Sequence, residues 1–397
     1  MSGPIDGIRV LDLSRILSGP FCTMLLADLG AEVVKVEMPG RGDPARNVGP
    51  MVGYDSASFI SVNRGKKSIT LDLNSEDGQK IFRELIPHFD VLVENFVPGT
   101  MAKFGLDYQS VQKLNSSLVY LSISGFGQDG PYARMPAMDI VVQAMGGIMS
   151  VTGEPGKPPL RAGISLGDSV AGLFAALAVV SALYQRVSSG GGQHIDMSML
   201  DCQVTMMENA FSRYFSTGDI PGPTGSSHPL AAPFQAFEAS DGYFVIALLT
   251  DDQEIWGNFC SAIGRDDLRK DSRFIDNATR VSNIGELKGN LDKTFLEKSC
   301  LEWVEILSNA RIPCGPINNI ESVARDPQLI HRSMFRTIPH KYADEWKIAN
   351  TPFRFSNSVT GPTGPSPALG EQNDELFPLL IGLSGEEIAS LLERRVI

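Results

Sequence analysis

Short apolar runs alternate with amphipathic stretches along the first third of the chain. The runs rich in Val, Ile and Leu predict strands over residues 8–13, 32–37, 68–73, 91–96 and 118–124. The stretches between them predict helices over residues 20–29, 76–87 and 100–114. Strands and helices that alternate at this spacing form βαβ units, so we expect an α/β fold with a Rossmann-like parallel sheet. Ligands of such folds bind beyond the carboxyl ends of the strands.

The pattern changes after an apolar helix expected over residues 170–184. Residues 190–192 are three glycines that end this helix, and residues 218–227 have the composition of a linker. Shorter strands and charged helices then follow, for example over residues 243–248 and 284–297, and they predict a smaller α+β domain. We therefore expect a large Rossmann-like domain over residues 1–200, a linker over 201–228, a small domain over 229–320, and a linker with a C-terminal return to the large domain over 321–397. A last helix is expected over residues 385–394.

The composition of the 397 residues is that of a globular protein, with 43% hydrophobic and 20% charged residues. The net charge of −12 lacks the basic footprint of a nucleic-acid or membrane-surface binder, so we expect neither as a partner. A phosphate-bearing ligand would need a local basic patch. Residues 63–67, Asn-Arg-Gly-Lys-Lys, and Lys103 are the candidates for one, although solvated surface side chains would give the same pattern.

Cysteine use and the first residues indicate a cytoplasmic protein. The five cysteines stand singly, without a CxxC pair, which argues against a disulfide framework. No basic leader followed by an apolar stretch is visible at the N-terminus. The most apolar run, residues 169–185, is shorter than a membrane span and is better interpreted as a buried helix.

Several familiar motifs fail on inspection. Residues 125–130 spell GxGxxG after a strand, but Pro131 and Pro136 prevent the helix that a dinucleotide site needs, and no acidic residue follows at the usual distance. A flexible glycine-rich loop is the better interpretation. The histidines are far apart and show no HExxH spacing, so we expect no metal site. No serine stands in a GxSxG elbow.

Asp168 is the carboxylate that attracts most attention. It stands in Gly-Ile-Ser-Leu-Gly-Asp-Ser, just before the apolar helix, where it could simply cap the helix. A carboxylate at a helix start is also kept ionised by the helix dipole, and the neighbouring Gly167 leaves room for a ligand, so Asp168 could act as a covalent nucleophile. His228 lies in a loop at the expected domain junction, where substrate pockets often form.

The chain resembles the class III CoA-transferases of the CaiB/BaiF type over essentially its whole length. Ordered motifs in one register carry this resemblance: residues 7–12, 29–37, 63–71, 93–99, 124–127 with Gly130 and Pro131, the pair Gly167 and Asp168, 312–318 and 367–371.

The resemblance implies that Asp168 is the nucleophile, which attacks an acyl-CoA thioester to give a mixed anhydride and then carries CoA as an aspartyl thioester. Coenzyme A is thus implied as a co-substrate, with no permanently bound cofactor. The implied acids are small, and we expect a dicarboxylic acceptor, with Gly225 and His228 as substrate residues. The implied CoA contacts are Ile16, Leu17, Ser18, Met38, Leu71, Asp72, Asn74, Asn95, Phe96, Val97, Lys103, Pro136, Met138 and Asp139. Members of the family are interlocked homodimers, so a homodimer is expected.

Two departures and one alternative accompany the resemblance. The formyl-CoA branch has glutamine at the position of Leu17 and arginine at that of Met38, which weakens a formyl or oxalate assignment and leaves one adenine or phosphate contact open. The same fold also hosts 2-methylacyl-CoA racemases, which place a histidine where this chain has Met138. Methionine cannot carry a proton, so transfer is favoured over racemisation.

Overall fold

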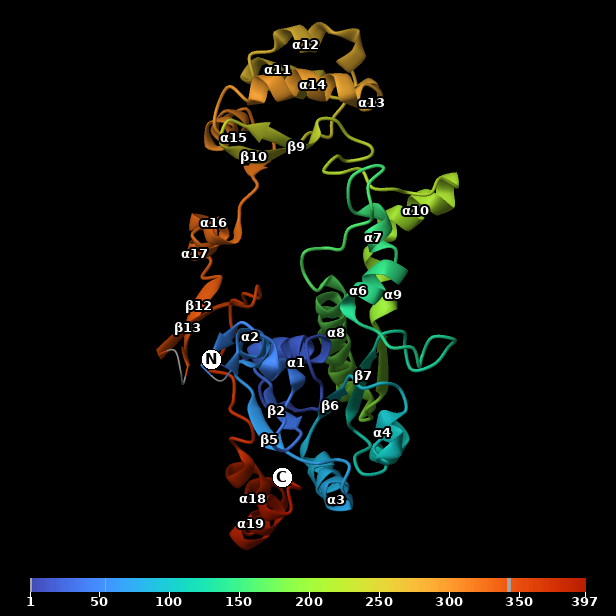
Figure 1. Cartoon of the computed structure of the whole chain (residues 1–397), viewed down its shortest axis with the longest axis vertical. Helices are drawn as coiled ribbons and strands as arrows, with labels where there is room; N and C mark the ends of the chain where they lie inside the picture. The colour runs from blue at the N-terminus through green and yellow to red at the C-terminus, as the bar shows by residue number, and fades with distance from the viewer. Residues whose placement is uncertain (1, 54, 341–343) are drawn as a thin grey trace. The chain divides into compact units, whose positions relative to one another are not determined.

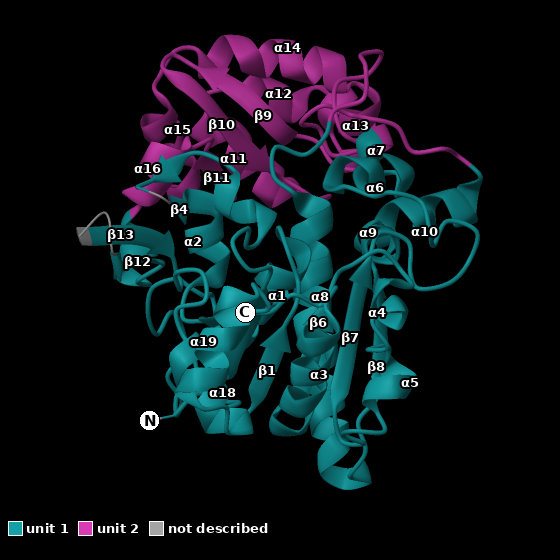
Figure 2. Cartoon of the chain, turned by 60° about the horizontal axis from the view of Figure 1, so that its bottom comes forward, with its two compact units in different colours: residues 1–149, 161–218, 327–397 teal, residues 150–160, 219–326 magenta. Residues whose placement is uncertain are grey.

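The computed structural model describes residues 2–53, 55–340 and 344–397, and the chain divides into two compact units (Figures 1 and 2). Unit 1 contains Met1–Met149, Arg161–Gly218 and Pro327–Ile397. Unit 2 contains Ser150–Leu160 and Asp219–Asp326. Two segments differ from the domain boundaries expected above. Residues 150–160 belong to unit 2, and residues 201–217, expected in a linker, are largely helical and belong to unit 1.

Unit 1 is built on a six-stranded sheet in which every pair of neighbouring strands is parallel, so the predicted α/β fold with a Rossmann-like sheet is confirmed. The strand order is β5-β2-β1-β6-β7-β8. The strands are β1 (Arg9–Asp12), β2 (Glu32–Glu37), β5 (Lys67–Thr70), β6 (Val91–Glu94), β7 (Val119–Ser124) and β8 (His194–Ser198). The first five match predicted strands, whereas the edge strand β8 alternates polar and apolar residues and was not predicted.

Both faces of this sheet are covered, because successive residues of each strand point to opposite sides. Leu11 and Leu92 face a cluster with Phe82 and Phe377, which belong to α3 (Glu76–Leu85) and α18 (Asn373–Ile381). The neighbouring residues of β1 and β6 face a second cluster on the other side. There the sheet is covered by α1 (Ser18–Asp28), α8 (Leu166–Ser189) and α9 (Met199–Met206).

α8 is the one helix among the described residues that is long and apolar enough to cross a membrane, and its most apolar window is 50% buried. It packs on α1, α9 and β7, which identifies it as a core helix of unit 1. The contact with α1 is close. A Cβ at Gly172 would lie 2.6 Å from the carbonyl oxygen of Ser18, so glycine is required there.

One predicted helix is wrong. Residues 100–114 form two short helices, α4 (Thr100–Lys103) and α5 (Tyr108–Val111), because Gly105 between them takes a left-handed conformation with φ +64°. The remaining elements of unit 1 are η1 (Pro44–Asn47), β3 (Met51–Val52), β4 (Asp55–Ser56), α2 (Ala57–Asn63), η2 (Ile86–His88), α6 (Asp139–Met145), α10 (Glu208–Thr217), α17 (Pro327–His331), β12 (Phe335–His340), β13 (Asp344–Ala349) and α19 (Gly385–Glu393). Helix α7 (Ile148–Val151) lies at the boundary between the two units in sequence.

Unit 2 is the smaller α+β unit. Its antiparallel sheet has the order β11-β10-β9, with β9 (Phe234–Ala239), β10 (Gly242–Ala247) and β11 (Cys314–Pro316). The sheet packs with α14 (Ile284–Phe295) and α15 (Cys300–Asn309) around Phe237, Phe244 and Trp303. The other helices are α11 (Gln253–Ala262), α12 (Asp266–Lys270), η3 (Ser272–Phe274), α13 (Asn277–Ser282) and α16 (Ile320–Ala324).

Candidate active site

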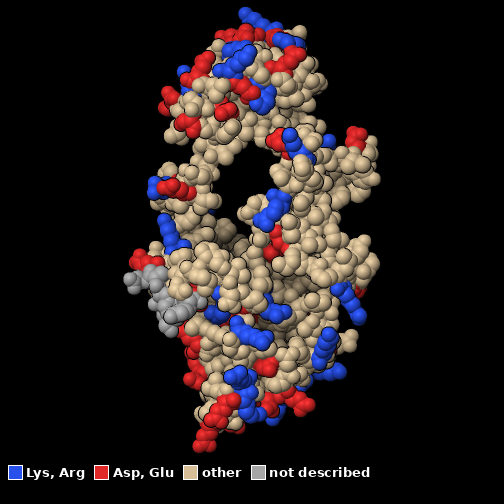
Figure 3. All heavy atoms as spheres, in the orientation of Figure 1, with Lys and Arg blue, Asp and Glu red and all other residues tan. Residues whose placement is uncertain are grey.

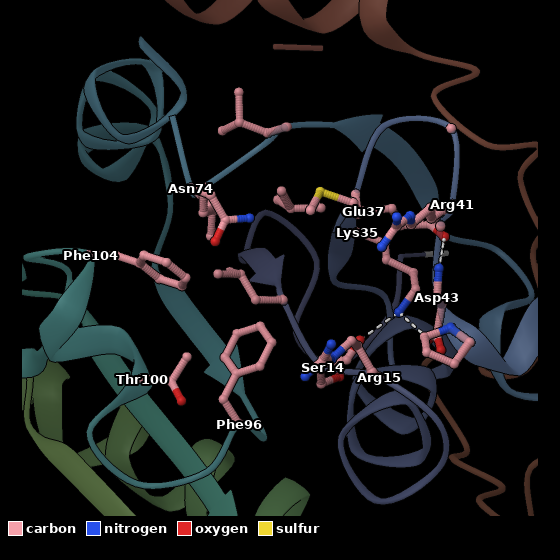
Figure 4. Close-up of a pocket in the computed structure, with 18 of the residues that line it drawn as sticks. Ser14, Arg15, Lys35, Glu37, Arg41, Asp43, Asn74, Phe96, Thr100 and Phe104 are labelled. Carbon is pink, nitrogen blue, oxygen red and sulfur yellow. Dashed lines mark hydrogen bonds and ion pairs between the residues drawn. The ribbon is translucent and has the colours of Figure 1, made fainter. Parts of the chain in front are cut away.

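Two adjoining cavities open at the carboxyl end of the parallel sheet in unit 1. The first has a volume of about 710 Å³ and is lined by residues that follow β1, β2, β5 and β6 (Figure 4). The second has a volume of about 360 Å³ and is lined by the β1–α1 turn, the loop after β6 and the loop after β7. Arg15, Pro44 and Phe96 line both cavities. The two cavities are therefore neighbours at the edge of the sheet where such a fold binds its ligands.

Asp168 lines the second cavity. Helix α8 begins at Leu166, so Asp168 lies in its first turn and not before the helix as expected. The residue before it is fixed from outside the helix, because the Gly167 N–H donates a hydrogen bond of 2.7 Å to Oδ1 of Asp139. A Cβ at Gly167 would lie 2.7 Å from Cγ2 of Val142 and 3.0 Å from Oδ1 of Asp139. Glycine thus allows the start of α8 to pack closely on α6.

The Asp168 carboxyl is harder to ionise than the helix dipole alone predicts. Burial, followed by the nearby negative charge of Asp139, raises the pKa of Asp168 to about 6. Burial and the charge of Asp139 thus oppose the ionisation that the start of a helix favours, and the carboxyl is still mostly ionised at pH 7. The side chain is half-buried, and among the described residues it makes no hydrogen bond, so it does not cap the helix. A poorly solvated carboxylate that faces a cavity is suited to nucleophilic attack.

The β1–α1 turn, residues 15–17, is held by hydrogen bonds from two sides. Asn95 accepts the Arg15 N–H at 2.8 Å through Oδ1 and donates to the Arg15 carbonyl at 2.8 Å through Nδ2. Asp43 accepts the Ile16 N–H at 3.0 Å. Ile16 has φ +67°, a left-handed conformation that β-branched residues rarely adopt. Ile16, Leu17 and Ser18, three of the predicted CoA contacts, all line the second cavity.

The loop after β6 is anchored by Glu94, which is buried at the end of that strand. Its Oε2 accepts the Phe96 N–H at 2.8 Å. Burial raises the pKa of Glu94 to about 7. Asn95, Phe96 and Val97, which are also predicted CoA contacts, line the second cavity, and Phe96 lines the first as well.

Sequence reasoning missed two basic residues in the first cavity. The guanidinium of Arg15 lies 4.5 Å from the centre of the Phe96 ring, and Arg41 is exposed (Figure 4). Within the described residues neither guanidinium has a carboxylate partner, so both are free to bind an anion. Each follows the end of a parallel strand by three or four residues, β1 for Arg15 and β2 for Arg41. That position was the available signal. On the face shown in Figure 3, Lys and Arg are otherwise mixed with Asp and Glu.

The basic cluster at residues 63–67 does not supply a phosphate site. Arg64 pairs with Asp28 at 2.6 Å and Lys66 with Asp12 at 3.0 Å, and all four side chains are buried. Lys67 pairs with Glu32 at 3.0 Å and with Glu375 at 2.9 Å. These cations neutralise carboxylates of unit 1, so Arg64 and Lys66 are neither a phosphate patch nor the solvated surface side chains that were the alternative.

The other predicted CoA contacts divide between the cavities and their surroundings. Met38, Leu71 and Asn74 line the first cavity, and Met138 and Asp139 line the second. Asp72, Lys103 and Pro136 line neither. The Asp72 carboxylate instead accepts the Asn74 N–H at 2.9 Å, while Lys103 is exposed at the end of α4.

The glycine-rich segment after β7 forms a loop, as predicted. Gly127 and Gly130 take left-handed conformations with φ +90° and +87°, and no helix begins before α6 at Asp139. Gly125 and Met138 of this segment line the second cavity. The literal GxGxxG therefore does not open a helix toward a dinucleotide.

His228 and Gly225, predicted as substrate residues, belong to unit 2. The His228 ring stacks on Phe234 with centroids 4.8 Å apart, and its Nδ1 accepts the Leu230 N–H at 3.2 Å. The Gly225 N–H donates to the carbonyl of Gly153 at 2.8 Å. These local contacts position the loop within its unit. The described residues include no group of three or more His, Cys, Asp or Glu side chains that could hold a metal ion.

The chain matches the CoA-transferase family III over residues 5–373. The chain belongs to this family. It is 43% identical over 333 residues to the acetyl-CoA:oxalate CoA-transferase of Acetobacter aceti, with 84% of this chain and 85% of that protein covered. It is 38% identical over 396 residues to the succinyl-CoA–D-citramalate CoA-transferase of Chloroflexus aurantiacus, with 99% and 98% covered.

A solved structure of a CaiB/BaiF family protein from Brucella suis has the same fold, with a TM-score of 0.86 and 38% identity over 96% of this chain and 100% of that chain. The resemblance inferred from the motifs is thus confirmed. The protein is a class III acyl-CoA:carboxylate CoA-transferase.

Proposed function

We propose that this class III CoA-transferase moves CoA from a small acyl-CoA, of the succinyl-CoA or acetyl-CoA type, to a dicarboxylic acid, with Asp168 as the nucleophile. The observation that carries the proposal is the position of Asp168 in the second cavity, half-buried and with its pKa raised to about 6. At neutral pH the carboxylate is mostly ionised yet poorly hydrated, so its attack on a thioester loses little solvation.

The bond changes follow from this nucleophile. An Asp168 oxygen attacks the thioester carbonyl, which forms a mixed anhydride and releases CoA thiolate. The thiolate then attacks the Asp168 carbonyl of the anhydride, which forms an aspartyl-CoA thioester and releases the donor acid as a carboxylate. The acceptor carboxylate attacks that thioester, which forms a second mixed anhydride with Asp168 and releases CoA thiolate. The thiolate then attacks the acceptor carbonyl of this anhydride, which forms the acceptor-CoA thioester and releases the Asp168 carboxylate. Asp168 is regenerated and no net proton is consumed.

The two cavities suit a CoA that lies along them with its sulfur near Asp168. We place the adenosine and phosphates in the first cavity, beside Arg15 and Arg41, where two unpaired cations can offset the negative charge of the protein as a whole. Arg41 would then supply the contact that Met38 lacks. Lys103, which is exposed at the end of α4, remains a predicted contact to a phosphate of CoA.

A dicarboxylic acceptor is supported by the relatives, whose names specify oxalate in one case and D-citramalate in the other. Leu17 and Met138 place apolar side chains in the second cavity, which favours an acid with carbon atoms between its two carboxylates over oxalate. His228 and Gly225 remain predicted substrate residues.

Racemisation of 2-methylacyl-CoA is the alternative reaction, and it is the weaker one. It needs a second group that exchanges a proton with the α-carbon opposite Asp168. By the resemblance, racemases have a histidine at the position of Met138, which lies in the second cavity. The thioether of a methionine cannot carry a proton.

We also propose a homodimer, because α8 and α10 expose large apolar side chains, among them Leu177, Val187 and Phe215. With five free cysteines, a reducing cytoplasm remains the expected compartment.

The test is a thioester exchange assay. The purified protein is incubated with succinyl-CoA or acetyl-CoA and, one at a time, with oxalate, malonate, succinate, glutarate, citramalate and matched monocarboxylates, and new CoA thioesters are detected by mass. We expect at least one new dicarboxyl-CoA, which is absent with Asp168→Asn. Exchange that survives in Asp168→Asn would overturn the role of Asp168. Incorporation of deuterium at C2 of a 2-methylacyl-CoA, without any exchange, would instead support the racemase.

A further inference from the structure

Ile16, in the wall of the second cavity, has an unfavourable backbone conformation. Its φ of +67° lies in the left-handed region, where the branched side chain crowds its own backbone. The local sequence does not favour this conformation, since the neighbours of Ile16 are Arg15 and Leu17, neither of which is glycine or proline. Contacts from other parts of the chain must therefore impose it.

Asp43 supplies the contact that meets Ile16 itself. Its Oδ1 accepts the Ile16 N–H at 3.0 Å and the Ala45 N–H at 2.9 Å. The acceptor is fixed in turn, because the Asp43 side chain is buried and its Oδ2 lies 2.9 Å from Nζ of Lys35. Lys35 also donates to the Ser14 carbonyl at 2.6 Å, just before the turn (Figure 4).

The two ends of this chain of contacts belong to different cavities. Lys35 and Asp43 line the first cavity, where we place the phosphates, and Ile16 lines the second, which Asp168 also lines. Asn95 clamps the Arg15 N–H and carbonyl but leaves the Ile16 N–H to Asp43. We propose that Asp43 is a positioning residue that holds Ile16 in its left-handed conformation and so shapes the acyl end of the site. This inference rests on the proposed function.

The role of Asp43 in the turn differs from its role in the ion pair, and two substitutions separate them. Asp43→Asn keeps an oxygen that can accept the Ile16 N–H but removes the charge that pairs with Lys35. Asp43→Ala removes both. We expect Asp43→Ala to lower kcat/KM for CoA exchange about 30-fold, and Asp43→Asn to lower it less than fivefold.

The decisive variant, Ile16→Gly, removes the steric cost of the left-handed conformation and leaves Asp43 to be changed separately. Glycine adopts a positive φ at no steric cost, so Ile16→Gly no longer needs the acceptor on Asp43. Introduced into Asp43→Ala, it should raise kcat/KM at least fivefold, even though alone it lowers the activity by removing a cavity side chain. The matched control is Arg395→Gly, which relieves a similar φ of +57° at an exposed site that lines neither cavity. It should rescue nothing.

A buried Lys35 without its partner could prevent folding, so the same rescue is repeated in a Lys35→Met/Asp43→Ala background. Equal losses in Asp43→Asn and Asp43→Ala, or no rescue by Ile16→Gly in a folded background, would overturn the proposal. Hydrogen exchange of the peptide covering residues 13–19 follows the turn in the free protein. Hydrogen exchange there should be faster in Asp43→Ala than in Asp43→Asn, and equal protection in the two variants would contradict the proposal. This measurement does not depend on activity. If the unaltered protein transferred no CoA, that result would overturn the proposed function but not the role of Asp43 in the turn.

Discussion

The carboxylate of Asp139 accepts the Gly167 N–H at 2.7 Å, and its charge also raises the pKa of the next residue, Asp168. One side chain thus sets both the position and the ionisation of the proposed nucleophile. Its other oxygen accepts a hydrogen bond of 2.8 Å from Gln143, one turn further along α6. The start of α8 is therefore held to α6 by a carboxylate whose two oxygens both accept hydrogen bonds.

The pH dependence of exchange should reflect this pair. Asp168 attacks only when ionised, and its pKa is raised to about 6, so activity should be low at acid pH, rise through about pH 6 and level off above it. Asp139→Asn keeps an oxygen for the Gly167 N–H but removes the like charge. The acidic limb of the profile should then move to lower pH, by part of the whole shift, because burial is the larger cause.

The measurement is kcat/KM from pH 4.5 to 8 for the unaltered protein and the variant. Asp129→Asn, which removes an exposed carboxylate from the loop after β7, is the control and should leave the profile in place. An acidic limb that stays where it was in Asp139→Asn would show that Asp139 does not control the ionisation of Asp168.

Replacing the nucleophile should stabilise the fold. The folded-state pKa of Asp168 lies above that of an unfolded aspartate, so the ionised group opposes folding at every pH above its folded pKa. Asp168→Asn removes this cost and should raise the free energy of unfolding by roughly 2 kcal/mol at pH 7.5, with a Tm higher by a few degrees. The gain should fall to a small fraction near pH 4, where Asp168 is protonated in the fold and an unfolded aspartate is about half ionised. Thermal unfolding at the two pH values checks this, and an equal gain at both would point to packing instead.

The sheet of unit 1 was predictable because its central strands are buried on both faces. A strand such as Val91–Glu94 must be apolar on both sides to pack between two layers of helices, and that leaves a continuous apolar run in the sequence. The edge strand His194–Ser198 has one solvated side, so its signal is weaker and it was missed. The same limit explains the predicted helix over residues 100–114, where Gly105 takes a left-handed conformation that composition alone does not demand.

Asp168 could be found from its motif, but its environment could not. The pKa of a carboxyl depends on what buries it, and Asp139 is 29 positions away in the chain. Arg15 and Arg41 each had a weak signal, a position just after the end of a parallel strand, but only the fold brings the ends of separate strands together into one cavity. Conversely, Arg64 and Lys66 looked like a phosphate patch only because their carboxylate partners, Asp28 and Asp12, are distant in sequence.

Arg41 should contribute mainly to CoA affinity. Its guanidinium is exposed in the first cavity, and a charge-assisted hydrogen bond to phosphate typically contributes about 1.5–3 kcal/mol. Arg41→Gln should therefore raise the Kd of CoA at least about tenfold, with a smaller change in kcat. Calorimetric titration with CoA at two salt concentrations measures this, and the variant should show the weaker salt dependence. Arg395→Gln, an exposed arginine outside both cavities, is the control. Equal affinities for CoA in the two variants would remove Arg41 from the site.

Two glycines of α8 should respond differently to alanine, because different atoms fill the space where each Cβ would be. At Gly172 the obstacle is backbone, the Ser18 carbonyl oxygen at 2.6 Å, so α1 and α8 must move apart and stability should fall by about 1–3 kcal/mol. At Gly167 the nearest atoms are side-chain ends, Cγ2 of Val142 and Oδ1 of Asp139, which can shift. Gly167→Ala should therefore unfold at nearly the unaltered temperature but lose most of its exchange activity, because Asp168 moves with its neighbour.

Gly163→Ala is the matched control for both, since a Cβ there would meet open space. Thermal unfolding and kcat/KM for the three variants separate the two effects. Full activity in a folded Gly167→Ala protein would mean that the contact between Asp139 and Gly167 does not set the position of Asp168.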